Sequence, residues 1–585
     1  MDNIVNITIN DIPVAVKKGD SILDAAAQIG VEIPSLCYLN MHDLDVLNRP
    51  ASCRVCMVEQ VDGRKPKLVP ACATFVYEGM AVQTNSKKSI HVRRTVLELL
   101  LSDHPTDCLT CAKNLSCDLQ RYAADLGIDK VHYEGESTAF KQDKSGHSLV
   151  RDPNKCVLCR RCEAVCENVQ SVGVLSAVGR GFDTTIGTAF NEPITETQCT
   201  ACGQCVAVCP TGALTGMEHT REVWVALQDP DKFVVVQTAP AIRAALGEMF
   251  EMPPGTGVTG KMVAALRRLG FDRVLDTNFA ADITVIEESA ELMERVKSGG
   301  KLPLLASCCP AWILFCEHHY PDLLDHPSSC KSPAEMFGAL AKTYLAEKLG
   351  IDPAKMVVVS IMPCLAKKYE AHRSELKNNE LPNVDYVLST RELARMIKEA
   401  GILFKRLPDE KFDSIMGESS GAADIFGSTG GVLEAVLRSY CERSTGKTLD
   451  KLEFESLRGF SGIGVKEAKI DVDGEEIRVA VVHELRNARL LLDEIRAGNS
   501  PYHAIEIMAC PGGCIAGGGQ PYHHSDEETL TKRREVLYNE DKGKKLRRAH
   551  ENQEVKKLYD EYLGGPNSEK AHKLLHTTYV RRSVY

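Results

Sequence analysis

The sequence predicts a multidomain α/β protein in which several small cysteine-rich domains precede one larger domain built on parallel sheets. Three observations lead to this fold class. The chain has 585 residues, too many for a single hydrophobic core. Fifteen of its 23 cysteines precede residue 210, in regular spacings. From about residue 223, apolar strand-like runs alternate with amphipathic helical stretches, a pattern typical of parallel strands joined by helical crossovers.

The composition excludes several classes of protein. The chain has 70 basic and 80 acidic residues, a net charge of −10, and no basic block suited to nucleic acid or to an anionic membrane surface. Its beginning lacks the pattern of a secretory signal, and no apolar run reaches the roughly 18 residues of a membrane span. Cysteine-rich chains without an export signal are typical of a reducing cytoplasm, where thiolates bind metal.

Residues 1–85 are predicted to form a small β-grasp sheet with one helix. ITIN and PVAV are strand candidates, and Ser21 to Asp24 is a capping box that starts a helix ending near Gly30. Four cysteines follow, at Cys37, Cys53, Cys56 and Cys72. A CxxC pair flanked by single cysteines is similar to plant-type [2Fe–2S] ferredoxins, although the first gap is fifteen residues instead of four. A structural zinc site is the alternative.

Residues 86–145 carry a helix over 88–101 and then an unusual ligand set. The four residues are His104, Cys108, Cys111 and Cys117. Three thiolates and an imidazole can hold zinc. Because this segment lies between two iron–sulfur patterns, we favour a [4Fe–4S] cluster in which His104 replaces the fourth thiolate.

Residues 146–222 contain two matching cysteine runs. The first run is Cys156, Cys159, Cys162 and Cys166, and the second is Cys199, Cys202, Cys205 and Cys209, followed by proline. This spacing predicts the bacterial two-cluster ferredoxin, in which the fourth cysteine of each run ligates the other [4Fe–4S] cluster. The glycine-rich insert GRGFDTTIGTAF separates the halves, so the module is an internal repeat with a spacer.

Residues 223–525 bring a second group of cysteines to the ends of strands. The strand candidates are KFVVVQTAP, RVLDTNF, KLPLLASCCP, MVVVSIMPC and HAIEIMACPGGC. Three of them end in cysteine, at Cys308 and Cys309, at Cys364, and at Cys510 with Cys514. Ligands bind at the carboxyl ends of strands in open α/β sheets, so these cysteines are expected to converge on one site.

In three of these segments the chain resembles the [FeFe]-hydrogenases, and the resemblance covers nearly its whole length. The segments match the signatures TSCCP, MPCxxKxxE and ExMACPGGCxxGGGQP, the last present in full from Glu506 to Pro521. The resemblance implies reversible reduction of protons to H2 at an H-cluster. It also implies that Cys309, Cys364, Cys510 and Cys514 bind the [4Fe–4S] half of that cluster. Cys514 would bridge to a di-iron subsite carrying CO, cyanide and a bridging dithiolate amine.

The same resemblance implies roles for the residues around the cluster. Cys308 would exchange protons with the amine, and Lys367 would donate a hydrogen bond to a cyanide. Met362 and Met508 would pack on the diatomic ligands, opposite a wall formed by Ala239 and Pro240. Glu288, Glu291 and Ser328 match a proton route that leads outward from Cys308. The alternative for the two glutamates is the solvated face of an amphipathic helix.

Some positions depart from the family pattern without removing a ligand. They are Ala241, Ala306, Ala311, Ala334 and Leu365, where many members carry residues such as serine, threonine, glycine or glutamine. We expect these changes to alter the potential of the site or its bias between H2 oxidation and evolution.

Three cysteines and one glycine-rich segment remain outside these assignments. Cys316, Cys330 and Cys441 have no common spacing and are expected to be small buried apolar residues. The segment from Gly255 to Lys261 begins like a phosphate-binding loop, but Met262 stands where a serine or threonine would reach magnesium. No GxGxxG follows a strand elsewhere, so we expect neither NAD nor flavin to bind this chain.

Residues 526–585 are charged and helical and resemble the small subunit of two-subunit hydrogenases. The full set of cofactors implied is one [2Fe–2S] cluster, three accessory [4Fe–4S] clusters and the H-cluster. A chain of this kind is expected to be the catalytic subunit of an NAD(P)-linked or electron-bifurcating complex. Its partners would be flavin- and NAD(P)-binding subunits and ferredoxin, with the N-terminal domain as the docking contact. The alternatives are a ferredoxin-linked monomeric hydrogenase, a sensory hydrogenase-like protein, and an electron-transfer or iron–sulfur assembly protein.

Overall fold

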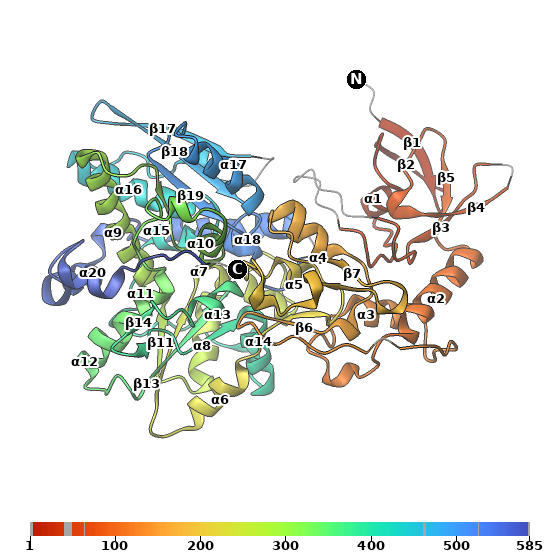
Figure 1. Cartoon of the computed structure of the whole chain (residues 1–585), viewed down its shortest axis with the longest axis horizontal. Coiled ribbons are helices and arrows are strands. Elements are labelled where there is room, and N and C mark those ends of the chain that lie inside the picture. Colours follow the sequence, from red (N-terminus) through yellow and green to blue (C-terminus); the bar gives the residue numbers. More distant parts are fainter. Residues whose placement is uncertain are drawn as a thin grey trace.

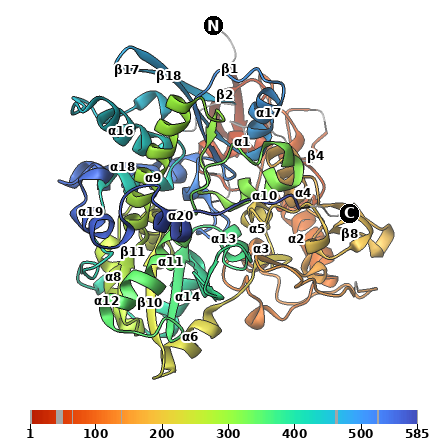
Figure 2. The same ribbon diagram turned by 60° about the vertical axis from the view of Figure 1, so that its left-hand side comes forward.

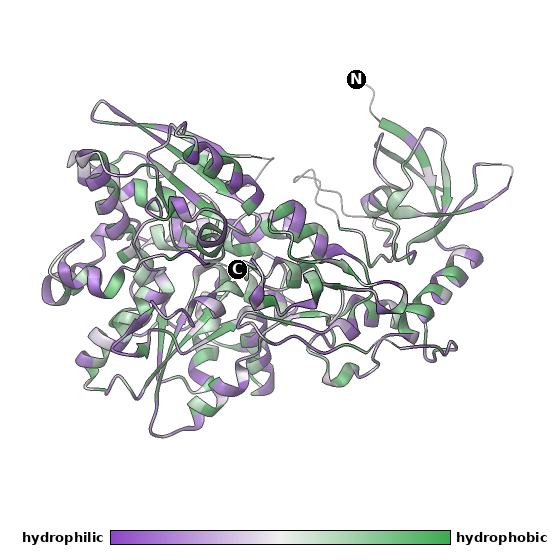
Figure 3. Ribbon diagram, in the orientation of Figure 1, coloured by the Kyte–Doolittle hydropathy of each residue, from purple (hydrophilic) through white to green (hydrophobic). Residues whose placement is uncertain are grey.

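The computed structural model describes residues 4–39, 50–63, 65–137, 139–459, 464–523 and 526–582. The cysteine-rich N-terminal units extend to the right in Figure 1, and the larger α/β domain forms the bulk of the molecule on the left. Figure 3 shows hydrophobic stretches running through the interior of this domain, with hydrophilic residues more frequent on its outer helices. Within the described part of the chain, no helix has the length and apolar character needed to cross a bilayer.

The N-terminal domain is a five-stranded sheet crossed by one helix, as predicted. Its strands, in the order β2-β1-β5-β3-β4, are β1 (Ile4–Ile9), β2 (Ile12–Lys17), β3 (Met57–Gln60), β4 (Lys67–Pro70) and β5 (Ala81–Gln83). Helix α1 (Ile22–Gln28) begins with the predicted capping box. The Ser21 hydroxyl accepts from the Asp24 N–H, and the Asp24 carboxylate accepts from the Ser21 N–H.

Two helices connect this sheet to the ferredoxin-like module. Helix α2 (Lys87–Ser102) spans the predicted 88–101, and the buried Arg93 fastens it to the sheet by donating to the carbonyl of Met57 at 2.9 Å. Helix α3 (Asp118–Asp125) begins where the N–H of Asp118 donates to the carbonyl of Pro210 at 2.9 Å. The segment that holds the His104 set is therefore attached to both neighbouring modules.

The ferredoxin-like module has the predicted internal repeat. Its strands are β6 (Leu149–Arg151), paired with β9 (Leu214–Gly216), and β7 (Ser176–Val178), paired with β8 (Thr185–Gly187). Helices α4 (Arg161–Ala164) and α5 (Gln204–Val208) each follow a left-handed residue, Arg160 with φ 62° and Gly203 with φ 75°. These residues hold the same place in the two cysteine runs, so the halves are related in backbone as well as in spacing.

The larger domain contains two four-stranded sheets, which confirms the predicted two-lobed α/β architecture. The first sheet is entirely parallel, in the order β11-β10-β13-β16: β10 (Phe233–Thr238), β11 (Arg273–Asp276), β13 (Met356–Met362) and β16 (Tyr386–Ser389). The second has the order β12-β19-β18-β17: β12 (Leu304–Leu305), β17 (Lys466–Val472), β18 (Glu475–His483) and β19 (Ala504–Met508). The antiparallel hairpin β17–β18 was not predicted. A short pair, β14 (Lys377–Asn378) and β15 (Leu381–Pro382), lies outside both sheets.

Helices cover both sheets and join the lobes. They are α6 (Thr220–Gln228), α7 (Pro240–Ala245), α8 (Thr259–Leu269), α9 (Thr277–Ser298), α10 (Pro310–His319), α11 (Pro333–Leu340), α12 (Ala346–Leu349), α13 (Ala366–Glu370), α14 (Thr390–Glu399), α15 (Gly421–Asp424), α16 (Gly431–Thr445) and α17 (Leu485–Arg496). The long helix α9 contacts α11 from the first lobe and α16 from the second. Because most of its residues are buried, α9 is a shared central element of both lobes.

The C-terminal segment returns across the larger domain instead of extending into solvent. It contains α18 (Glu527–Gly543), α19 (Gln553–Leu558) and α20 (Glu569–Leu575), joined through the short turns η16 (Ala549–Glu551) and η17 (Tyr559–Leu563). Helix α18 packs on α7 and α15, α19 on α9, and α20 on α11. Figure 2 shows α18, α19 and α20 on the same side of the molecule as α9. The side chains of Leu537, Val555 and Leu575 are fully buried in these contacts.

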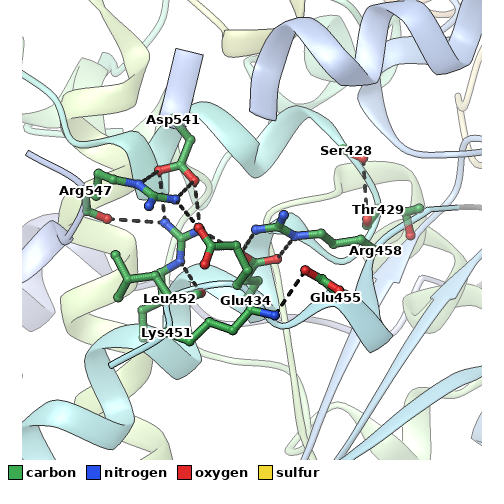
Figure 4. A network of polar contacts seen from close by, with 11 residues as sticks. Ser428, Thr429, Glu434, Lys451, Leu452, Glu455, Arg458, Asp541 and Arg547 are labelled. Carbon is green, nitrogen blue, oxygen red and sulfur yellow. Dashed lines mark hydrogen bonds and ion pairs between the residues drawn. The ribbon is translucent and has the colours of Figure 1, made fainter. Parts of the chain in front are cut away.

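A buried network of charges fastens the segment to α16 (Figure 4). Arg438 donates to Asp541 at 2.9 Å and to Glu434 at 2.6 Å, and the side chains of all three are inaccessible to solvent. Arg547 donates to Asp541 at 2.7 Å, and Arg458 donates to Glu434 at 2.7 Å. Buried charges are stable only when each has an opposite partner. The loss of one side chain therefore leaves another charge uncompensated.

We expect Asp541→Asn to destabilise the larger domain by about 3 kcal/mol, because Arg438 and Arg547 would lose a charged partner in a buried place. The measurement is the urea midpoint of the apoprotein. The matched control is Lys451→Ala, which removes the exposed pair with Glu455 that Figure 4 also draws, and should leave the midpoint unchanged. Equal midpoints for Asp541→Asn and the wild type would contradict the assigned role of the network.

Candidate functional site

Four cysteines from different motifs lie together between the two sheets. Cys309 follows β12, Cys364 follows β13, and Cys510 and Cys514 follow β19. Burial raises the pKa of Cys364 to about 12, and the charge of Cys309 adds to this shift. Burial followed by the charges of Cys364 and Cys309 also raises the pKa of both Cys510 and Cys514. The expected convergence at strand ends is therefore present in the structure.

The backbone around these cysteines is shaped by one helix terminus and by close approaches at glycines. Cys309 is the N-cap of α10, where the helix dipole favours negative charge on the sulfur. Gly513 has φ 98°, and a Cβ there would lie 2.6 Å from the amide nitrogen of Thr429. A Cβ on Gly518 would lie 2.6 Å from the carbonyl oxygen of Gly203. The glycines of the third motif thus let the chain approach both the residues just before α16 and the ferredoxin-like module.

Cys308 and Lys367 lie next to the four cysteines. Burial and then the charge of Glu288 raise the pKa of Cys308 well above its usual value. The Lys367 ammonium donates to the carbonyl oxygen of Cys308 at 3.2 Å and to Glu370 at 2.8 Å. The carboxylate of Glu370 accepts a further bond from Ser332 at 3.0 Å. Glu370, which the sequence analysis did not single out, therefore orients the ammonium toward the site.

Apolar side chains enclose Cys308 and the four cysteines. Met508 and Ala306 belong to a buried cluster against which Cys308 and Cys514 pack. The sulfur of Met508 lies near the Gly513 turn, 3.1 Å from where a Cβ would be. Met362, Ala239 and Pro240 are also buried, at the end of β13 and the start of α7. The predicted wall residues are thus apolar and inaccessible to water, although their contact with a ligand stays a prediction.

The residues that depart from the family pattern have packing partners of their own. Leu365 lies 3.0 Å from where a Cβ of Gly203 or Gly216 would be, so it fills the contact between the ferredoxin-like module and the larger domain. The carbonyl of Ala241 accepts from Gln520 at 3.0 Å, and that of Ala334 accepts from Gln237 at 2.9 Å. The carbonyl of Ala306 accepts from Trp312, and Ala311 is buried in the same lobe. An effect on potential or bias stays a prediction.

The predicted proton-route residues lie on adjacent elements. Glu288 on α9 is buried; burial raises its pKa to about 8, and the charge of Glu291 adds to the shift, while Ser307 partly offsets it. One turn further along α9, Glu291 accepts from the Ser328 hydroxyl at 2.7 Å and from Arg295 at 2.6 Å. Glu288 therefore lies between the Cys308 thiol and the Glu291 pair, which rules out the solvated face for this glutamate.

The ferredoxin-like module exchanges the fourth cysteine between its two runs. One small cavity is lined by Cys156, Cys159, Cys162 and Cys209, and the other by Cys166, Cys199, Cys202 and Cys205. Burial raises the pKa of Cys159 to about 12, with Cys209 adding to the shift. Burial likewise raises the pKa of Cys202 to about 12, with Cys199 and Cys166 adding to it. These contacts match the crossed arrangement predicted from the spacing.

The four cysteines of the N-terminal domain are also brought together. Cys37, Cys53, Cys56 and Cys72 share one apolar cluster, and the sulfurs of Cys56 and Cys72 are 3.3 Å apart. In the next segment, burial lowers the pKa of His104, and its Nδ1 atom is buried with no hydrogen-bond partner. A Cβ on Gly212 would lie 2.7 Å from the sulfur of Cys111, so this set lies directly against the ferredoxin-like module.

These sites fit iron–sulfur clusters. Every cysteine is a free thiol. At the main site and in the ferredoxin-like module, burial raises the pKa of thiols such as Cys364 and Cys159, a cost that bound iron would offset because it holds thiolates directly. A neutral imidazole with an unpartnered nitrogen is what a metal requires of His104. Among the residues that the structure describes, no three suitable side chains close on a single metal ion. In the ferredoxin-like module the cysteines line two small cavities, four to each.

Sequence reasoning missed Gln204 and the role of Glu506. The Gln204 amide donates to the sulfur of Cys510 at 3.1 Å and to the carbonyl of Ala516 at 3.2 Å, linking the second cysteine run to the main site. No spacing rule identifies it. Burial raises the pKa of Glu506 to about 7, and this residue accepts from the N–H groups of Gly430 and Leu433 at the start of α16. Its presence in the third motif was the available signal.

The remaining residues singled out by the sequence are packed against other parts of the protein. Cys316, Cys330 and Cys441 are buried, as predicted. In the loop that resembles a phosphate site, the Lys261 ammonium donates to the carbonyl of Leu407 at 2.6 Å, and a Cβ on Gly260 would lie 2.5 Å from a side-chain atom of Asp409. Both residues lie in the first turn of α8, so this end of the segment packs against protein instead of facing open space.

Family models match successive parts of the chain. Residues 232–518 match "Iron only hydrogenase large subunit, C-terminal domain", and residues 527–582 match "Iron hydrogenase small subunit". Residues 2–87 match "2Fe-2S iron-sulfur cluster binding domain". Residues 93–132 match "NADH-ubiquinone oxidoreductase-G iron-sulfur binding region", and residues 146–215 match "NADH-quinone oxidoreductase subunit 3, ferredoxin-like domain".

Similar proteins cover the chain from end to end. NADP-reducing hydrogenase subunit HndD of Solidesulfovibrio fructosivorans is 55% identical, covering 99% of both chains. Iron hydrogenase 1 of Clostridium pasteurianum is 38% identical, covering 98% of this chain and 100% of that protein. Among solved structures, a variant of [FeFe]-hydrogenase HydA1 from Chlamydomonas reinhardtii superimposes with a TM-score of 0.56 at 41% identity. That match covers 62% of this chain and 99% of the other.

The raised pKa of Glu288 predicts how stability depends on pH. The folded protein holds the carboxyl proton up to about pH 8, whereas the unfolded chain releases it near 4.5, so folding is favoured most below pH 4.5 and less as the pH rises to 8. Glu288→Gln removes this loss, and its stability relative to the wild type should increase by on the order of 3 kcal/mol between pH 5 and pH 8. The measurement is the urea midpoint of the apoprotein at each pH.

The control for this prediction is Glu294→Gln on the exposed side of the same helix. Its stability difference from the wild type should be the same at both pH values. If Glu288→Gln also shows a constant difference, the Glu288 carboxyl is not held protonated by its surroundings.

Proposed function

Because this chain belongs to the [FeFe]-hydrogenase family and is an oxidoreductase that uses H2, we propose that it catalyses 2 H⁺ + 2 e⁻ ⇌ H2 at an H-cluster within an NAD(P)-linked complex. The observation that carries the proposal is the buried convergence of Cys309, Cys364, Cys510 and Cys514 with a fifth thiol, Cys308, beside them. Four ligands and one free thiol facing a protonated glutamate are what proton reduction at a cluster requires.

The four cysteines would hold the [4Fe–4S] half of the cluster, with Cys514 bridging to the di-iron subsite. The cluster, once bound, supplies the metal at which electrons and protons combine. Lys367 supplies a fixed positive charge that is held in place by Glu370, and its ammonium can donate to an anionic ligand such as cyanide. Met362, Met508, Ala239 and Pro240 would exclude water from the diatomic ligands and keep the local dielectric low.

Protons would reach the cluster through groups on α9 and its neighbours. The Cys308 thiol stays protonated at neutral pH because burial and Glu288 raise its pKa. Glu288, with a pKa of about 8, can accept and release a proton near neutral pH. Beyond it, Ser328 and Glu291 form a 2.7 Å hydrogen bond that continues outward to Arg295.

Electrons would travel through the accessory clusters in the order of the domains. We propose one [2Fe–2S] cluster on the first quartet and three [4Fe–4S] clusters, one of them with His104 as ligand. The last step in this order, from the second cysteine run to the main site, is short. The Gln204 amide donates to the sulfur of Cys510, and the charge of Cys202 is among those that raise the pKa of Cys510. The domain limits 1–85, 86–145, 146–222, 223–525 and 526–585 are part of this proposal.

Protein matured with the di-iron subsite should show infrared bands of CO and cyanide and should exchange H2 with D2. We expect Cys308→Ser to keep the bands but to lower H2 evolution by about 100-fold or more, because a serine hydroxyl is a far weaker proton donor. The control is Cys441→Ala, a buried cysteine on α16 outside the site, which should retain full activity. Absence of the bands from correctly matured wild-type protein would refute the H-cluster assignment.

The NAD(P)-linked complex is the finer part of the proposal. Its support is the similarity to the NADP-reducing hydrogenase subunit and to two iron–sulfur regions named after NADH oxidoreductases. In such a complex, flavin- and NAD(P)-binding subunits would dock on the N-terminal domain, and ferredoxin would be a further electron carrier, in the cytoplasm. A ferredoxin-linked monomer is the second candidate, because the accessory clusters alone can serve a soluble donor.

Purification from the native host separates these two candidates. We expect a flavin-containing subunit to co-elute with this chain, and NAD(P)H-dependent H2 evolution to be lost when residues 1–85 are deleted while artificial electron donors still support evolution. Elution as a lone chain that is active with reduced ferredoxin would contradict the complex and favour the monomer.

A further inference from the structure

The C-terminal segment forms hydrogen bonds with the stretch of chain that carries Ser328. The N–H of Lys331 donates to the carbonyl of Leu575 at 2.8 Å, and the N–H of Thr577 donates to the carbonyl of Ser329 at 2.7 Å. The Tyr579 hydroxyl donates to the carbonyl of Ser328 at 2.7 Å. Residues 328–331 are therefore held by the tail at the point where the proposed proton route passes.

One histidine of the tail is hydrogen-bonded on both ring nitrogens at this place. Nε2 of His576 lies 3.1 Å from the Glu287 carboxylate, and Nδ1 lies 2.8 Å from the Ser329 hydroxyl. The same carboxylate accepts from the Tyr559 hydroxyl at 2.5 Å and from the N–H of Asn567 at 2.8 Å. The imidazole thus links a buried acid on α9 to a hydroxyl on the neighbouring stretch.

Both partners of His576 adjoin the proton route in the chain. Glu287 precedes Glu288, and Ser329 follows Ser328. The N–H of Ser329 also points to Glu291, at 3.5 Å from its carboxylate. His576 therefore contacts the immediate neighbours of three of the proposed route residues, although it lies almost 250 residues away in the sequence.

The imidazole is buried, and the ring beside it belongs to an exposed residue. The ring of His572, an exposed residue one turn earlier on α20, is 4.3 Å from the ring of His576 between centroids. His576 itself keeps 8% of its surface accessible. The other titratable groups near it are Glu287 on α9, Tyr559 in η17 and Arg443 on α16, which donates to the carbonyl of Ile286. The stretch of chain beside it adds the Cys330 thiol and the Lys331 ammonium, which donates to the carbonyl of Leu574, and the tail adds Tyr579.

We propose that His576, supplied by the C-terminal segment, is a proton-exchange residue that gives the proton route a second outer end besides the one at Arg295. The imidazole takes a proton from solvent on the His572 side and returns it through Ser329 and Glu287 toward the carboxylates of α9, and in H2 oxidation the transfer runs in reverse. No bond other than those to the moving proton changes. This role rests on the proposed hydrogenase function, because it concerns the protons of that reaction.

The chain contains a matched control for this residue. His550, in η16 of the same segment, lies 3.0 Å from the Glu442 carboxylate and 3.0 Å from the Ser439 hydroxyl. It is therefore another imidazole between a glutamate and a serine that also fastens the tail to the larger domain. None of its partners adjoins Glu288, Ser328 or Glu291 in the chain. A substitution of His550 therefore measures only the effect of weakening the attachment of the tail.

The experiment compares His576→Gln with His550→Gln in the full-length, matured protein. Glutamine keeps hydrogen-bonding groups but cannot titrate. We expect His576→Gln to lower H2 evolution by about five-fold at pH 8, to change the shape of the pH profile, and to raise the solvent isotope effect in D2O. His550→Gln should leave the profile and the isotope effect as in the wild type.

A second measurement uses the apoprotein and does not depend on activity. In protein with ¹⁵N-labelled histidine, the ring N–H lost in His576→Gln should exchange with water faster than the ring N–H lost in His550→Gln. A His576 ring proton that exchanges no faster than that of His550 overturns the proposal, and so do equal pH profiles and isotope effects for the two variants when the wild type is active. Inactive wild-type protein with CO and cyanide bands missing would instead refute the proposed function, and the exchange rate would still decide whether His576 exchanges protons.

Discussion

The burial of several thiols in one water-free place is the constraint on which the rest of this structure depends. Taking ionised sulfurs out of water is costly, and the raised pKa values of Cys364 and Cys514 express that cost. Positive charge must offset it, and the surroundings supply it in fixed positions. Cys309 caps the N-terminus of α10, and the Lys367 ammonium is held beside Cys308 by Glu370. Iron bound to the four sulfurs would complete the compensation.

A site of this kind also has to be closed, and the C-terminal segment contributes to the closure. Leu537 on α18 packs in the same cluster as Ala241 and Cys514. The buried network around Arg438 and Asp541 fixes that helix in place, since neither partner tolerates the loss of the other. A segment that resembles a separate subunit is therefore part of the core of the larger domain and a source of polar partners for α9.

Close backbone approaches join the cysteine-rich modules and the larger domain into one continuous series of cysteine sites. Gly212 lies against the sulfur of Cys111, and Gly518 lies against Gly203 inside the second cysteine run. Leu365, which departs from the family pattern, fills the space between these parts instead of leaving room for a polar group. The order of the domains in the chain is consequently also their order in space, from the N-terminal sheet to the strand ends of the larger domain (Figure 1).

The sequence by itself determined the cysteine spacings, the strand–cysteine pattern and the N-terminal sheet with its capping box at Ser21. These features are local, because cysteine spacing and strand ends are properties of short segments. Tertiary structure alone decided which groups from distant segments meet. Gln204 contacts Cys510 across 306 residues, and His576 contacts Glu287 across 289. The hairpin β17–β18 and the burial of Glu288 were likewise not evident from the sequence. Burial depends on which elements cover a helix, and for α9 those elements come from both lobes and from the end of the chain.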